Sequence, residues 1–146
     1  ALEGTDVLAT SLVLEVTEHS LAEGEAVASS LSLLRRAGVR VALDDFGTGY
    51  SSLTQLERLG VDIVKVDRDF VRSPTPDSPR HEAFLRGVVN MVRALDVTIV
   101  VEGVETEAER QELLRAGFSL GQGFLLGTPT DHPLDIAVSG GQRPLA

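Results

Sequence analysis

Short runs of branched apolar residues alternate with segments of helical periodicity along most of this chain. The runs are rich in valine and isoleucine and are too short for helices, so they predict β-strands. We expect these strands at residues 12–16, 39–43, 62–66, 98–101 and 123–126. Because almost wholly apolar strands that alternate with helices pair in parallel, the chain is predicted to form an α/β fold with about five parallel strands.

The intervening segments carry apolar residues at helical spacing. Helices are expected near residues 31–36, 53–59, 84–95 and 107–116. Three of them end at Gly38, Gly60 and Gly117, where a left-handed glycine would close the helix. The Pro-rich residues 73–79 are expected to form a surface loop, and residues 138–146 a frayed tail. At 146 residues, with 42% apolar and 24% charged residues, the chain has the size and balance of one globular domain.

Charge and composition exclude several roles. The 22 acidic and 13 basic residues give a net charge of -9, which disfavours binding to duplex nucleic acid or to anionic lipid. The absence of cysteine rules out disulfides and thiolate metal sites and fits a cytoplasmic location. No apolar run approaches the roughly 20 residues that cross a bilayer, so we expect no direct membrane contact, although upstream segments of a parent protein could supply an anchor.

Polar residues gather at the carboxyl ends of the expected strands. Parallel strands bring these ends to one face, where α/β folds place ligands and chemistry. Residues flanked by apolar neighbours, such as Glu15 and Lys65, need a charged partner or a metal if they are buried. The residues that share this placement are Glu15, Glu18, Asp44, Asp45, Lys65, Glu102, Glu105 and Gln122.

An all-oxygen set of carboxylates predicts a hard cation, Mg²⁺ or Mn²⁺. The adjacent Asp44 and Asp45 would let two ions share a ligand, an arrangement suited to hydrolysis of a phosphate ester. Lys65 would polarise the attacking water or offset charge on a phosphoryl oxygen. The glycines that follow, at positions 47 and 49, predict a mobile or tightly turned loop beside the metal, with Ser51 or Ser52 capping the next helix.

Each of these residues also has an ordinary structural interpretation. An acidic residue after a strand is commonly a helix cap or a solvated loop residue. Lys65 could be an edge-strand charge that blocks aggregation, and Gln122 lies between glycines that could mark a bulge. The joint placement of the set on one face is what favours a site. The three histidines, His19, His81 and His132, are expected to be surface residues.

Five stretches of the chain resemble the EAL domains, bacterial cyclic-di-GMP phosphodiesterases built as modified TIM barrels. They read LEVTE (14–18), ALDDFGTGYSSL (42–53), VKVDRDF (64–70), VEGVET (101–106) and GQGF (121–124), in the order of that family and close to its spacing. The resemblance covers residues 12–129 and implies hydrolysis of cyclic-di-GMP to linear pGpG. It implies that Glu15 and Asp44 are metal ligands and that Asp45 binds a second metal or orients water.

The same resemblance implies further roles. Lys65 contacts the catalytic water, Glu102 serves the same metal and water centre, and Glu105 and Gln122 support it. Glu18 would brace a regulatory loop that the family links to metal occupancy and to dimerisation. In this chain that loop comprises Phe46, Gly47, Thr48, Gly49, Tyr50, Ser51 and Ser52.

The chain departs from the family pattern because the Glu-Ala-Leu strand and the following asparagine strand are absent. Residues 1–11 resemble only the end of the preceding helix and loop, and residues 130–146 form a C-terminal extension. A full barrel of this type has eight strands in about 250 residues, so we expect a partial TIM barrel. Such a chain would need the missing N-terminal part of its own domain or a second copy, and would be inactive alone with weakened metal binding.

Three functions therefore remain open. The first is the C-terminal part of a metal-dependent cyclic-di-GMP phosphodiesterase, with Glu15, Asp44, Asp45, Lys65 and Glu102 in the chemistry. The second is a catalytically inactive module that binds cyclic-di-GMP or a partner protein. The third is an unrelated metal-dependent barrel enzyme. Retention of every motif acid expected within residues 12–129 favours the first.

Overall fold

A computed structural model describes residues 8–17, 20, 25–47, 56–57, 59–72, 78–128 and 143–145 of the chain. It contains one sheet with the strand order β1-β2-β3-β4-β5-β6. The first five strands are parallel and follow one another in sequence, and β6 runs antiparallel to β5. Their bounds are Val13–Thr17, Arg40–Phe46, Ile63–Val66, Thr98–Val101, Leu120–Gly121 and Arg143–Pro144. The predicted α/β fold with five parallel strands is confirmed.

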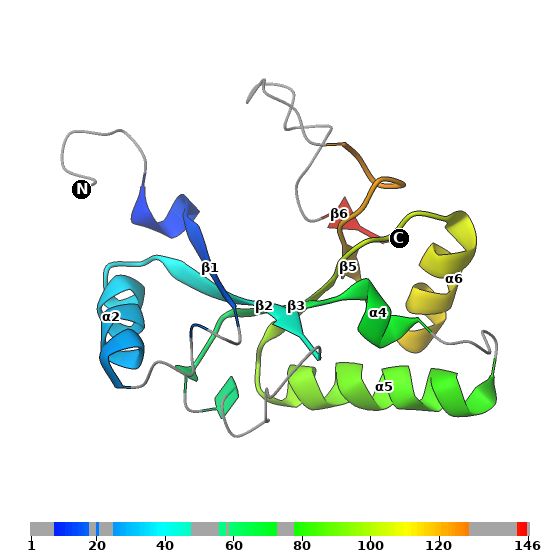
Figure 1. Ribbon diagram of the computed structural model, residues 1–146, viewed down its shortest axis with the longest axis horizontal. Helices are drawn as coiled ribbons and strands as arrows, with labels where there is room; N and C mark the ends of the chain where they lie inside the picture. Colours follow the sequence, from blue (N-terminus) through cyan, green and yellow to red (C-terminus); the bar gives the residue numbers. More distant parts are fainter. Residues whose placement is uncertain are drawn as a thin grey trace.

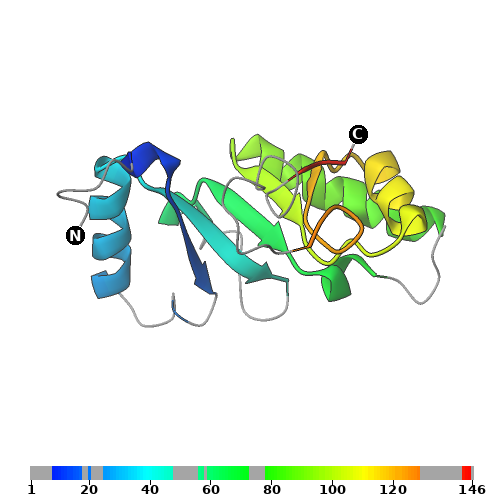
Figure 2. The same cartoon turned by 90° about the horizontal axis from the view of Figure 1, so that it is seen from above.

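The helices flank the two ends of this sheet. Figures 1 and 2 show α2 (Glu25–Arg36) beside β1 and β2, and the pair α5 (Pro79–Ala94) and α6 (Glu107–Ala116) beside β3 to β5. Two short helices complete the described elements, η1 (Ala9–Ser11) and α4 (Arg68–Val71). Most of the helix expected at 53–59 lies outside the described residues. None of the helices that the structure describes is long and apolar enough to cross a membrane.

The glycine caps predicted from the sequence are confirmed. Gly38, Gly60 and Gly117 have φ angles of 94°, 57° and 100°, in the left-handed region that glycine adopts without a side-chain clash. At Gly117 the backbone N–H donates to the carbonyl oxygen of Leu114 at 3.0 Å, which closes α6. These caps direct the chain from α2 into β2 and from α6 towards β5.

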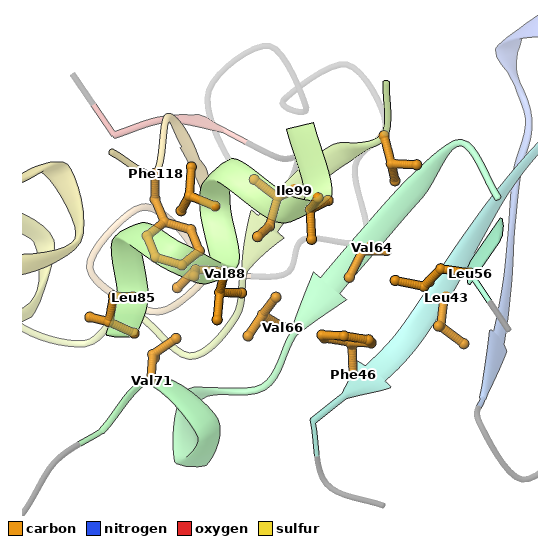
Figure 3. Packing of buried hydrophobic residues seen from close by; sticks show 14 of the residues in the cluster. Leu43, Phe46, Leu56, Val64, Val66, Val71, Leu85, Val88, Ile99 and Phe118 are labelled. Atoms are coloured by element: carbon orange, nitrogen blue, oxygen red, sulfur yellow. The ribbon is translucent and has the colours of Figure 1, made fainter. Parts of the chain in front are cut away.

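The two faces of the sheet have different surroundings. One face packs against the helices through a large apolar cluster that Figure 3 shows closely interdigitated; it includes Leu43, Val64, Val66, Leu85, Val88, Val92 and Phe118. The opposite face carries the small buried cluster of Ala42, Ile63 and Val100. Because side chains alternate along a strand, residues two positions further on, Lys65 and Glu102 among them, are directed to this second face. On this second face, the small apolar cluster is therefore followed directly by the polar residues at the carboxyl ends of the strands.

Two sequence predictions about the C-terminal part are wrong. The strand expected at 123–126 is a turn, in which the N–H of Leu126 donates to the carbonyl oxygen of Gly123 at 2.9 Å. The strand β5 precedes it; in the turn, Phe124 is 70% exposed whereas Leu126 packs against the apolar core. The expected frayed tail is also wrong at Arg143–Pro144, which forms β6, and Leu145 beyond it is fully buried. The sequence feature that could have indicated this packing is Leu145, a single leucine in a polar segment.

His81 is not a surface residue, contrary to the prediction. Its ring Nε2 lies 2.8 Å from the carbonyl oxygen of Val71, and its side chain is only 12% exposed. The ring also stacks on Phe84. His81 therefore joins the start of α5 to the end of α4. The other two histidines, His19 and His132, lie outside the described residues.

Candidate active site

Lys65 is at the centre of a cluster of acidic side chains on the second face of the sheet. Its Nζ lies 3.0 Å from Glu15 Oε2, 3.2 Å from Asp44 Oδ1 and 2.9 Å from Glu102 Oε1. The acids come from β1, from β2 and from the position just after β4, so the parallel register brings them together. The lysine side chain is 5% exposed, which makes it a buried charge with three partners.

The acids keep this buried lysine charged. Burial alone would lower the pKa of Lys65, but the hydrogen bonds that it donates to Glu102 and Glu15 outweigh this effect and raise the pKa above its usual value. Burial also raises the pKa of Glu102, and this effect outweighs the opposing contact with Lys65, with the charge of Asp44 adding to the rise. A single ammonium group thus faces an excess of carboxylates, which leaves the cluster with net negative charge.

A bulge lets two consecutive aspartates serve the same face. The register of β2 against β3 shifts between Leu43 and Phe46, so Asp44 and Asp45 together lie opposite the single residue Lys65. Asp45 has a φ of 56°, which is uncommon for a residue with a side chain, and its N–H donates to Asp44 Oδ1 at 3.1 Å. Regular alternation would point the two side chains to opposite faces, and the bulge removes that constraint.

Three of the acids are placed to hold a cation. Asp44, Asp45 and Glu102 each offer a carboxylate oxygen, and these oxygens all lie within 4.8 Å of one another. An all-oxygen donor set with excess negative charge fits Mg²⁺ or Mn²⁺. Glu15 adds a fourth carboxylate that contacts Lys65 and is half exposed to solvent.

The structure gives Glu105 and Gln122 other contacts. Glu105 pairs with Arg68 and lies 3.6 Å from Arg72, away from Lys65. Gln122 acts through its backbone: its N–H donates to Val101 at 2.8 Å and its carbonyl oxygen accepts from Val104 at 3.0 Å, while its side chain is exposed. These bonds fix the loop that follows β4.

Only the start of the predicted regulatory loop can be placed. Phe46 is buried, and Gly47 has a φ of 101° and lies so close to Phe70 that a Cβ would be 2.2 Å from its ring. Glycine is therefore required where the chain leaves the aspartate pair. The predicted site residues Glu18, Thr48, Gly49, Tyr50, Ser51 and Ser52 lie outside the described residues.

Sequence reasoning missed a group of charged residues beside the site. Glu109, at the third position of α6, accepts hydrogen bonds from the N–H groups of Glu105 and Thr106 at 3.0 and 2.9 Å. It also accepts from Arg72 Nη2 at 2.9 Å. The Thr-x-x-Glu spacing of a capping box was readable in the sequence, since Thr106 in turn accepts from the Glu109 N–H at 3.2 Å. The partnership with Arg72 was not, because 37 residues separate the two.

Gly123 provides a test of how tightly the loop after β4 is held. A Cβ on Gly123 would lie 2.3 Å from the backbone N and O of Val104, and backbone atoms cannot give way as a side chain can. We expect Gly123→Ala to destabilise the fold by about 2 kcal/mol or more in urea unfolding. The matched control is Gly87→Ala in α5, where nothing lies within 4 Å and a gain of about 0.5 kcal/mol is expected. Equal unfolding midpoints for the two variants would contradict this description of the loop.

Comparisons with known proteins cover most of the chain. The model of the EAL domain family matches residues 1–129. The chain is 44% identical over 119 residues to MucR of Pseudomonas aeruginosa, named as a bifunctional diguanylate cyclase/cyclic di-GMP phosphodiesterase, which is 81% of this chain and 17% of MucR.

Solved structures show the same similarity. The PaMucR phosphodiesterase in its c-di-GMP complex has a TM-score of 0.76 and 40% identity, with 88% of this chain and 52% of that chain covered. The Klebsiella pneumoniae BlrP1 complex with manganese and cy-diGMP has a TM-score of 0.75 and 34% identity, with 98% of this chain and 33% of that chain covered. The chain thus spans about half of the PaMucR structure and less than a fifth of MucR.

Proposed function

The chain belongs to the EAL domain family, its parallel strands forming part of the family's TIM-type barrel, and from that membership we propose that it carries much of the site of a metal-dependent cyclic-di-GMP phosphodiesterase. The reaction proposed is hydrolysis of one phosphodiester bond to give linear pGpG. Relatives support it by their names, MucR and the Escherichia coli cyclic di-GMP phosphodiesterase PdeR. The observation that carries the proposal is the buried Lys65 held among Glu15, Asp44 and Glu102.

The acidic residues of the site are proposed to bind the cation and to leave room for the substrate. Asp44, Asp45 and Glu102 would hold Mg²⁺ or Mn²⁺, which in such sites supplies an activated water and neutralises phosphoryl charge. Asp45 is exposed, so its carboxylate is open to water and to substrate. The adjacency of Asp44 and Asp45 suits a pair of ions that share this edge of the site. A second ion beside Asp45 is part of the proposal.

Lys65 acts as a fixed positive charge. Its three acidic contacts keep the ammonium group charged and oriented, and they engage all three of its N–H groups. Lys65 would therefore offset charge on a phosphoryl oxygen, or donate to the attacking water where a bound cation draws one of these carboxylates away. Glu102 accepts from Lys65 and lies in the same oxygen group as the aspartates, so it can orient that water towards the phosphorus. Lys65 and Glu102 are thus the proposed catalytic residues.

We further propose that the metal's full ligand set includes residues beyond this sequence. The Glu-Ala-Leu and asparagine strands that the family resemblance leads us to expect would come from the rest of the same domain, because a second copy of this chain lacks them too. A second copy could still cover the open edge of the sheet, and light scattering of the chain in solution tests this, because a stable monomer would rule it out.

Hydrolysis of cyclic-di-GMP with Mn²⁺ tests the proposed function. It should be compared between this chain and a longer protein that contains a whole EAL domain around it, with chromatography of the linear product. We expect pGpG from the longer protein alone. If the longer protein binds cyclic-di-GMP and does not hydrolyse it, the chain belongs to a binding or regulatory module instead. Turnover by the isolated chain would show that the described acids suffice.

A further inference from the structure

The position of Glu102 depends on the loop that follows it. Glu102 is the first residue after β4, and its N–H donates to the carbonyl oxygen of Val66 at 2.9 Å. The chain then turns through Gly103, whose φ is 68°, and Val104 donates to Gln122 at 3.0 Å. These bonds fix one side of the loop. The other side faces a cavity.

That cavity has a volume of 580 Å³ and is lined by residues of the loop, of α4 and of α6. Its lining includes Arg68, Arg72, Glu102, Gly103 and Glu109. The loop already has one contact with α4, because Gly103 lies against the side chain of Arg68, which also pairs with Glu105. Where the loop borders the cavity, polar contacts replace the close packing that is missing there.

Arg72 and Glu109 supply a second set of polar contacts beside the Arg68–Glu105 pair. The Glu109 carboxylate binds the N–H groups of Glu105 and Thr106, and its Oε1 accepts from Arg72 Nη2 at 2.9 Å and from Arg72 Nε at 3.3 Å. Burial would raise the pKa of Glu109, but the bond from Arg72 and those from the backbone lower it to about 2. The carboxylate therefore stays ionised through the neutral and mildly acidic range.

The two partners join the elements that carry Lys65 and Glu102. Arg72 directly follows α4, the short helix after β3, and β3 contains Lys65. Glu109 lies in α6, directly after the loop that begins with Glu102. The Thr106 cap of α6 uses the Glu109 N–H and does not involve Arg72. Arg72 is thus dispensable for starting α6, and its contacts go to the loop and its anchor.

We propose that Arg72 and Glu109 form a clasp that positions Glu102 against Lys65. Neither residue touches the acidic cluster, so both are positioning residues and act through the loop. Together with the Arg68–Glu105 pair, the clasp fixes the separation of β3 and the loop after β4 along the cavity. Its catalytic consequence rests on the proposed function; its structural consequence does not.

Two readouts test the clasp separately. The first is hydrogen exchange of the Glu105 and Thr106 amides, compared between the unsubstituted chain and Arg72→Met, which keeps an apolar stem and removes every hydrogen bond. We expect at least about tenfold faster exchange in the variant, with partial recovery in Arg72→Lys. The matched control is Arg86→Met, which removes the exposed pair with Glu82 at 2.7 Å on α5 and should leave this exchange unchanged.

The second readout uses a protein that contains the whole domain. For Arg72→Met we expect kcat for cyclic-di-GMP to fall about tenfold with KM within about twofold, and the affinity for Mn²⁺ without substrate to fall severalfold. Glu109→Gln keeps one oxygen for the two backbone N–H groups but turns an NH2 group towards Arg72, so it should show a loss of the same kind. Unchanged exchange would overturn the clasp, as would faster exchange with unchanged Mn²⁺ affinity and kcat. Faster exchange and weaker Mn²⁺ binding in a protein with no hydrolysis would instead uphold the clasp and reject the proposed reaction.

Discussion

Replacing Lys65 with methionine is expected to destabilise the fold by about 2–4 kcal/mol at neutral pH, although methionine fits the buried space. The substitution leaves Glu15, Asp44 and Glu102 facing one another with no ammonium group between them. An apolar side chain cannot offset three carboxylates, two of which are less than a quarter exposed. Urea unfolding of the unsubstituted and Lys65→Met proteins measures the loss of stability. In a protein that contains the whole domain, hydrolysis of cyclic-di-GMP should also disappear when the ammonium group is removed.

The loss should shrink as the pH falls. Burial already raises the pKa of Glu102 in the unsubstituted protein, and removal of Lys65 takes away the contact that opposes this rise. The folded variant therefore takes up protons at a higher pH than its unfolded chain does. Stability contributed by such a group is present below its unfolded pKa and is lost as pH rises through its folded pKa. Unfolding at about pH 5 and about pH 7.5 should show a smaller deficit at the lower pH.

The control for this prediction is Arg86→Met, which breaks an ion pair whose partners are 58% and 40% exposed. Its cost should be no more than about 0.5 kcal/mol and nearly independent of pH in this range. A Lys65→Met protein as stable as this control would mean that Lys65 is not held as a buried charge.

Asp44→Asn should have opposite effects on stability and on hydrolysis. Asp44 contacts Lys65 and also contributes to the oxygen group with Asp45 and Glu102. The amide keeps the size of the side chain and can still accept from the Asp45 N–H, while it removes one negative charge from a cluster that has too many. The free energy of unfolding without metal should therefore stay within about 1 kcal/mol or rise.

Hydrolysis of cyclic-di-GMP by the whole domain should fall at least about a hundredfold in Asp44→Asn, because a lost ligand weakens the cation and its hold on water. Steady-state kinetics at several Mn²⁺ concentrations measures this loss. Asp69→Asn is the matched control, since Asp69 is 82% exposed and lies 4.0 Å from its nearest basic partner. If Asp44→Asn kept more than about a tenth of the activity, Asp44 would not be a ligand.

The strands were readable from the sequence because each combines a short apolar run with a glycine-capped helix before or after it. Thr98–Val101 and Glu107–Ala116 occur at the bounds that the pattern predicts. The fifth strand was misplaced because the run at 123–126 has the composition of a strand, whereas pairing with β4 occurs at Gly121. The composition of a segment shows only that it is apolar. Whether the segment becomes a strand depends on which of its backbone N–H and C=O groups reach a neighbouring strand.

Within the site, the sequence predicted that Glu15, Asp44, Asp45 and Glu102 gather near Lys65, but it did not predict how they do so. It also placed Glu105 in this group, whereas Glu105 pairs with Arg68. The alternation of β2 gives no sign that Asp44 and Asp45 can share a face, because Asp45 adopts a left-handed φ that is normally assigned to glycine. The Arg72 to Glu109 contact was likewise unreadable, since a pair so far apart in sequence depends on the packing of α4 beside α6. Only the cap made by Thr106 has a local pattern.

The removal and return of metal during hydrolysis test the central claim most directly. A protein that contains a whole EAL domain around this chain would be given cyclic-di-GMP with Mn²⁺, then an excess of chelator, and then Mn²⁺ again. We expect linear pGpG to form, to stop forming with the chelator and to resume with the metal, and none to form in Asp44→Asn. Hydrolysis that continues at the same rate after chelation, or none at saturating Mn²⁺, would contradict a metal site built on Asp44, Asp45 and Glu102.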